Sequence, residues 1–170
     1  DAAGLLPIPN TKGIELGGNG ALVGTAAPGG PGANVIAFNA VGVVATGSGN
    51  TIRGNAIHDN GLLGIDLGSN GVTPNDIGDG DIDSQNFPNI SSAVVEGGGV
   101  RVIGALESTP SSTFDLDFYE EPACSRFPQD YLEGGRWLGT APATTDGAGH
   151  AAFNVLIPSV TVDPGFRVTA

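Results

Sequence analysis

The stretch that decides the fold is residues 50–70, NTIRGNAIHDNGLLGIDLGSN. Within it the pattern Asn-x-Ile-x-x-Asn occurs twice in succession, first from Asn50 and then from Asn55. Its last part, GIDLGSNG from Gly64, matches an earlier run, GIELGGNG from Gly13, at six of eight positions. Asn, Gly and single aliphatic residues that recur at short, fixed spacing are typical of stacked β-repeats. We therefore expect a solenoid in the first half of the chain.

Working outward from this stretch, three short strands align as GIEL at 13–16, GVVA at 42–45 and GIDL at 64–67. The first spacing is longer because AAPGGPGA at 26–33 reads as an inserted loop. Residues 21–24 align with 51–54, and residues 34–39 align with 55–60. In parallel stacks like residues lie above one another, so we expect three inward-facing pairs: Leu22 with Ile52, Ile36 with Ile57, and Val43 with Ile65.

Asparagines mark the bends of these repeats. Asn tolerates left-handed backbone geometry, and its side chain can bond to a neighbour in the next layer. The alignment predicts two such pairs, Asn34 with Asn55 and Asn39 with Asn60. Asp66 aligns with Glu15, which predicts an outward-facing acid.

After residue 87 the strands become longer alternating runs separated by Gly, Pro and Asp turns. We expect six of them, at 90–96, 100–106, 114–121, 136–141, 150–157 and 166–170. Such spacing predicts an antiparallel sandwich of immunoglobulin-like type, which usually has about seven strands or more. The last run ends in mid-strand, so we expect at least one strand to be missing. The predicted domains are residues 1–87 and residues 88–170.

Two runs carry a family likeness. The first, NVIAFN at 34–39 through GVVATGSGNTIRGNAIHDNGLLGIDLGSNGVTPND to QNFP, resembles secreted bacterial right-handed parallel β-helix repeat proteins. The second, FDLDFYEEPAC with GRWLGTAPATTDGAGHAAFNV, resembles the β-sandwich module that follows the helix in such proteins. The resemblance implies an all-β chain with a short right-handed β-helix of about three coils and then an immunoglobulin-like sandwich. It also implies an extracellular or cell-surface location.

The composition limits the kinds of partner that this chain can bind. With 18 acidic residues against 6 Lys and Arg, the net charge is −12. A chain this acidic repels nucleic acid and anionic membranes, which are bound through Lys and Arg. No apolar run reaches the ~18 residues of a membrane span, so we expect no membrane insertion. Cys124 is the one cysteine, which excludes an internal disulfide.

Acidic residues crowd into one loop, at Asp76, Asp79, Asp81 and Asp83. Calcium takes six to eight oxygen ligands from flexible loops of this composition. The sequence therefore predicts a structural Ca²⁺ site, with a solvated acidic linker as the alternative.

An enzyme is the weakest hypothesis, although the β-helix superfamily includes pectate lyases and polygalacturonases. Hydrolases on this fold need converging carboxylates. Asp59 and Asp66 lie on different predicted strands, and nothing pairs them. We assign no catalytic residue, and a polysaccharide lyase or hydrolase remains only an alternative.

The leading hypothesis is a structural protein that self-associates into a surface filament or matrix, by β-strand addition or by coil stacking. An extended N-terminal arm with Leu5, Leu6 and Ile8 would join one copy to the unfinished last strand of another, at Val168. Neighbouring modules of a larger chain could serve instead of a second copy. The alternative is an adhesive or glycan-binding module, in which Tyr131 and Trp137 would contact the ligand.

Overall fold

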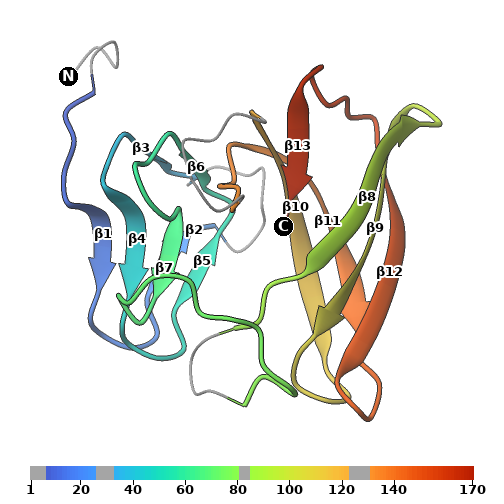
Figure 1. The fold of residues 1–170 in the computed structure, drawn as a ribbon, viewed down its shortest axis with the longest axis horizontal. Helices are drawn as coiled ribbons and strands as arrows, with labels where there is room; N and C mark the ends of the chain where they lie inside the picture. The colour runs from blue at the N-terminus through green and yellow to red at the C-terminus, as the bar shows by residue number, and fades with distance from the viewer. Residues whose placement is uncertain (1–6, 26–32, 81–84, 123–130) are drawn as a thin grey trace. The chain divides into compact units, whose positions relative to one another are not determined.

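The computed structural model describes residues 7–25, 33–80, 85–122 and 131–170, and the regular elements in them are all β-strands (Figure 1). Seven short strands come first: β1 (Lys12–Leu16), β2 (Leu22–Gly24), β3 (Val35–Ala37), β4 (Val41–Ala45), β5 (Thr51–Arg53), β6 (Ala56–His58) and β7 (Ile65–Leu67). Six more follow: β8 (Asn89–Glu96), β9 (Gly99–Glu107), β10 (Thr113–Pro122), β11 (Arg136–Thr144), β12 (His150–Pro158) and β13 (Phe166–Thr169). The described residues contain no helix long and apolar enough to cross a membrane.

Contacts divide the chain into two units, and the division differs from the predicted boundary after residue 87. The described residues up to Thr73 form the first unit together with residues 131–135, which lie between β10 and β11 in sequence. The second unit takes Pro74 onward and the remaining strands β8–β13, so the acidic loop belongs to it.

In the first unit, every strand pairs in parallel with the equivalent strand of the next repeat. The sheets are β1-β4-β7, β2-β5 and β3-β6, and Figure 1 shows the short strands side by side. Ile14 pairs with Val43 and Val43 with Ile65, which confirms the alignment of the three GIEL-like runs. Ile36 pairs with Ile57, also as predicted. These strands enclose a small apolar core of Val23, Ile36, Val43 and Ile57.

The predicted register of β2 is wrong by one residue. Val23, and not Leu22, pairs with Ile52, and Leu22 pairs with Thr51. Leu22 is therefore 57% exposed while Val23 is 8% exposed and lies in the core. The backbone around Gly24 explains the shift. Its φ of +101° is a left-handed conformation, and a Cβ there would lie 2.0 Å from the carbonyl oxygen of Arg53. That close approach needs glycine opposite Arg53, and alternation then turns Val23 inward.

Two predictions for β7 are also wrong, although its pairing is right. Ile65 is exposed rather than in the core, because in the described chain neither β5 nor β6 carries a further strand stacked beside it. Asp66 is buried rather than outward-facing. Its Oδ1 accepts hydrogen bonds from the main-chain N–H groups of Asn70 and Gly71, both at 3.2 Å. The loop after β7 folds back over this carboxylate, which is why it leaves solvent.

The second unit has two three-stranded antiparallel sheets, β11-β10-β13 and β12-β9-β8. All six strands lie where the sequence predicts them. Both sheets contribute to one core, in which Phe118 and Phe153 have ring centroids 5.9 Å apart. A β-bulge interrupts the β10–β11 register at Phe118/Tyr119.

The register of β2 can be tested by truncation. Val23→Ala should destabilise the first unit by about 2 kcal/mol, since it removes buried methyl groups and leaves a cavity. Leu22→Ala, the matched control one residue earlier, should cost below about 0.5 kcal/mol. Chemical denaturation followed by circular dichroism measures both. Equal losses, or a larger loss for Leu22→Ala, would contradict the observed register.

Candidate functional site

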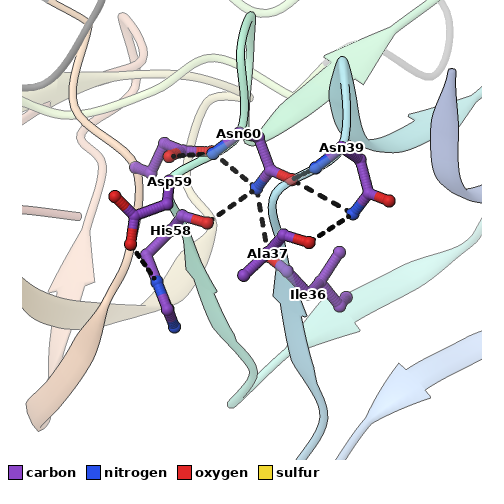
Figure 2. Close-up of polar contacts among 7 residues, drawn as sticks. Ile36, Ala37, Asn39, His58, Asp59 and Asn60 are labelled. Atoms are coloured by element: carbon purple, nitrogen blue, oxygen red, sulfur yellow. Dashed lines mark hydrogen bonds and ion pairs between the residues drawn. The ribbon is translucent and has the colours of Figure 1, made fainter. Parts of the chain in front are cut away.

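A ladder of asparagines stands at the bend before β1, β4 and β7, exposed at Asn10 and buried at Asn39 and Asn60. Asn10 donates from its main-chain N–H and its Nδ2 to Oδ1 of Asn39, at 3.4 and 3.3 Å. Asn39 donates in the same way to Oδ1 of Asn60, at 3.0 and 3.2 Å. Figure 2 shows Asn39 and Asn60 stacked, with Asn60 also bonded to the carbonyl oxygen of Ile36. The predicted pair Asn39–Asn60 is confirmed.

Left-handed backbone at this bend belongs to the residues before Asn39 and Asn60, not to the asparagines themselves. Phe38 has a φ of 61° and Asp59 has a φ of 55°. The sequence predicted that geometry for the asparagines themselves. The asparagines instead use their side chains between layers, and the preceding residue supplies the sharp turn. Asp59 also accepts from the ring of His58, with Nδ1 and Oδ2 2.9 Å apart (Figure 2).

Similar ladders occupy the other two bends. Asn34 donates from its main-chain N–H and Nδ2 to Oδ1 of Asn55, at 3.2 and 2.9 Å, which confirms the second predicted pair. Asn50 Oδ1 accepts from the main-chain N–H of Ala21 at 2.9 Å, 29 positions earlier. All three bends of the repeat are thus held by amide side chains.

Glu133 ends the first ladder. Asn60 donates its main-chain N–H to Oε2 of Glu133 at 3.0 Å and its Nδ2 to Oε1 at 2.8 Å, across 73 positions of sequence. The next residue, Gly134, accepts from the main-chain N–H of Ile57 at 2.8 Å and forms an antiparallel bridge with it. Glu133 is 8% exposed, and burial raises the pKa of its carboxyl group above the ordinary value, against the lowering effect of the bonds from Asn60. We call residues 131–135 the cap segment.

Each layer has an equivalent glycine that packs against the ladder residue of the following layer. These glycines show that Glu133 occupies the position of the next asparagine in the ladder. A Cβ on Gly13 would lie 2.7 Å from Nδ2 of Asn39, and a Cβ on Gly42 would lie 3.1 Å from Nδ2 of Asn60. A Cβ on Gly64, the equivalent residue of the next layer, would lie 3.3 Å from Oε1 and Cγ of Glu133. Glu133 therefore takes the asparagine's place in packing as well as in hydrogen bonding. Sequence reasoning missed it because it is distant in the chain and is not an asparagine.

The predicted calcium loop is only partly described. Asp79 Oδ1 accepts from the main-chain N–H of Asn86 at 2.9 Å, and its Oδ2 accepts from the hydroxyl of Ser108 at 2.8 Å. Both oxygens of Asp76 accept from the N–H of Gly80 at 3.1 Å. Asp81 and Asp83 lie outside the described residues. Among the residues with assigned positions, no three His, Cys, Asp or Glu side chains gather as a metal site would require. The calcium site remains a prediction.

The other predicted residues lie apart from the ladder. Ile8 is 68% exposed, whereas Leu5 and Leu6 are outside the described residues. Val168 pairs with Glu120 and packs against the core of the second unit. Tyr131, in the cap segment, is exposed. Trp137 is half-buried in β11, and its Nε1 is buried without an acceptor in the described part of the chain. The glycan-binding role of the last two stays a prediction.

Comparison of the sequence with protein-family models found no matching family, and comparison with curated proteins found no match.

Removing a buried ladder member should cost more than removing the exposed first member of another ladder. Asn60→Ala removes the side-chain oxygen that accepts from the main-chain N–H of Asn39 and the Nδ2 that donates to Oε1 of Glu133, so we expect a loss of about 3 kcal/mol. Asn34→Ala removes only a donor at an exposed position and should cost under about 1 kcal/mol. Denaturant titration measures both, and similar costs would contradict a role for the buried ladder in stability.

Calcium binding is tested by thermal melting of the protein after treatment with a chelator and again with added CaCl₂. At a hundredfold excess over its dissociation constant, bound calcium should stabilise the protein by about 2.7 kcal/mol. A double variant, Asp81→Asn with Asp83→Asn, should lose that gain. It spares Asp79, whose carboxylate holds the loop without metal. A melting curve that calcium leaves unchanged would favour the solvated acidic linker.

Proposed function

We propose that this chain is a non-catalytic extracellular structural protein whose copies join head-to-tail by β-strand addition. In this proposal the first unit is a short right-handed parallel β-helix and the second is an immunoglobulin-like sandwich that accepts a strand. One observation carries the proposal: a groove of the second unit, lined by polar and apolar side chains, lies between two edge strands that have no second partner in the described chain.

The groove is formed by β8 and β13 with the segment before β13. Its volume is about 480 Å³, and its apolar lining comes from Ile90, Val95, Val100, Val162, Phe166 and Val168. Among the described residues β8 pairs only with β9, and β13 pairs only with β10. Val95 on β8 is 58% exposed. Exposed apolar edge strands are templates for pairing with a strand of another chain.

The N-terminal arm has the chemistry of such a strand. Successive N–H groups of an extended chain point to opposite edges, and Pro7 and Pro9 remove the donors from one of them. Ile8 keeps its N–H on the other edge, whereas the N–H of Asn10 already donates to Oδ1 of Asn39. The arm can therefore pair on one side only, as the last strand of a sheet does. Residues 7–10 are exposed and form no strand within their own chain, which leaves Ile8 available to a partner.

The first unit supports the β-helix half of the proposal. Its three parallel sheets repeat in register, and an amide side chain holds each bend, as stacked coils require. The net charge of −12 and the single lysine fit an exported protein that needs neither nucleic acid nor an anionic membrane.

The proposal is tested by a complementation experiment. Ile8→Asp places a charge on the arm, and Val95→Lys places one in the groove, where an edge lysine opposes pairing. Sedimentation velocity over a concentration series should show assemblies of the wild type and at least tenfold weaker association of each variant. Leu62→Asp, which charges another exposed apolar position, is the control and should behave as the wild type.

Mixing the two variants gives the decisive result. Ile8→Asp retains an intact groove and Val95→Lys an intact arm, so a one-to-one mixture should form dimers that do not grow. Wild-type protein that stays monomeric at high concentration, or a mixture that associates no more than its components, would overturn the proposal.

A further inference from the structure

The asparagine ladder has a direction. Each member uses its main-chain N–H and Nδ2 as donors to the next layer, from Asn10 through Asn39 to Asn60. At the far end the donors of Asn60 meet Glu133, a carboxylate that can accept but cannot donate. At the near end Oδ1 of Asn10 receives no donor from the described residues. One end of the stack thus presents an acceptor, and the cap segment covers the donor end.

We propose that the donor end of the stack, at Asn60 and the edge of β6, is a second self-association surface that the cap segment occupies. Its other occupant is the Asn10 end of a second copy, whose Oδ1 would accept the two Asn60 donors that Glu133 now holds. The proposal rests on the self-association of the proposed function and adds a different surface to it. Two copies could therefore stack coil on coil at this surface, and Glu133 prevents this stacking while the cap segment is in place.

The donor end and the Asn10 end of the stack are complementary in more than the asparagine hydrogen bonds. The edge of β6 is engaged at Ile57 by Gly134, so a strand can add there only after the cap segment leaves. At the opposite end β1, β2 and β3 form the outer layer, where Leu22 is 57% and Val35 73% exposed. A second copy would bring these apolar residues and an asparagine acceptor together, repeating the contacts made between layers within one chain.

The charged groups around Glu133 give the cap a pH dependence. Its pKa is raised chiefly by burial, while the nearby His58 lowers it and Asp59 raises it. A carboxyl whose pKa is higher in the docked state favours docking most when it is protonated. This contribution is full below the ordinary pKa and is lost as the pH rises through the docked value. The cap should therefore open more readily at neutral than at mildly acidic pH.

The experiment uses an Ile8→Asp background, so that arm-dependent assembly is absent. There, Glu133→Ala should give at least tenfold stronger association in sedimentation velocity, and Asn10→Ala should reverse the gain by removing the acceptor. Glu133→Gln keeps a side-chain oxygen that can accept both bonds, as Oδ1 of Asn39 and Asn60 does, so it should remain closed. Glu15→Ala, which removes one exposed charge from the same unit, is the control and should change nothing.

The inference would be overturned if the folded Glu133→Ala protein did not associate in this background. It would also be overturned if adding Asn10→Ala left that association unchanged. The proposed function would be untouched, because its readout is loss of association in Ile8→Asp with Glu133 intact.

Hydrogen exchange of the wild-type chain supplies a measurement that needs no variant to fold. The amides of Ile57 and Asn60, which donate to the cap segment, should exchange at least tenfold faster than the core amide of Val43. After correction for intrinsic rates, the difference should grow as the pH rises from below the ordinary glutamate pKa to pH 8 in the wild type, and should stay constant in Glu133→Gln. Equal protection of all three amides would mean that the cap opens only on unfolding, and would refute the inference.

Discussion

A buried amide side chain must satisfy both its N–H donors and its oxygen, because each unpaired group costs about 1–3 kcal/mol. The first unit meets this demand by stacking asparagines, so that each oxygen serves the donors of the layer before it. The parallel register, the turn at Phe38 and Asp59, and the glycines that let layers approach all follow from keeping those amides aligned. The apolar cluster that these strands enclose is small, with Val23, Ile36, Val43 and Ile57 at its centre.

The same demand explains how the stack ends. A further asparagine would again need acceptors for its donors, and so would every later layer. Glu133 stops the series because a carboxylate only accepts, and it accepts both donors of Asn60. The cost is a buried acid whose pKa rises with desolvation. We therefore expect stability at the donor end to depend on pH. At the opposite end, no donor among the described residues reaches Oδ1 of Asn10.

In the second unit the feature of interest is a pair of edge strands rather than a buried amide. Its two sheets share a core around Phe118, yet β8 and β13 leave between them a groove lined by both polar and apolar side chains. Edge strands of this kind expose backbone groups and apolar side chains together, which isolated proteins usually avoid. The edge of β6 beside Asn60 and the edge of β8 thus differ in how they are covered. The edge of β6 is engaged by a segment of the same chain, whereas β8 has no second strand partner among the described residues.

From the sequence alone one can read the parallel stacks, two of the asparagine pairs and all six later strands, because spacing and alternation are local signals. Local spacing could not place Val23 inward, since the shift depends on Gly24 approaching the carbonyl of Arg53. Nor could it bury Asp66 under its own loop. Above all, it could not find Glu133, because the partner of Asn60 lies 73 positions away and shares no motif with it. Only the folded chain brings that carboxylate to the ladder. There it accepts the two bonds from Asn60 that an asparagine oxygen would accept in a further layer.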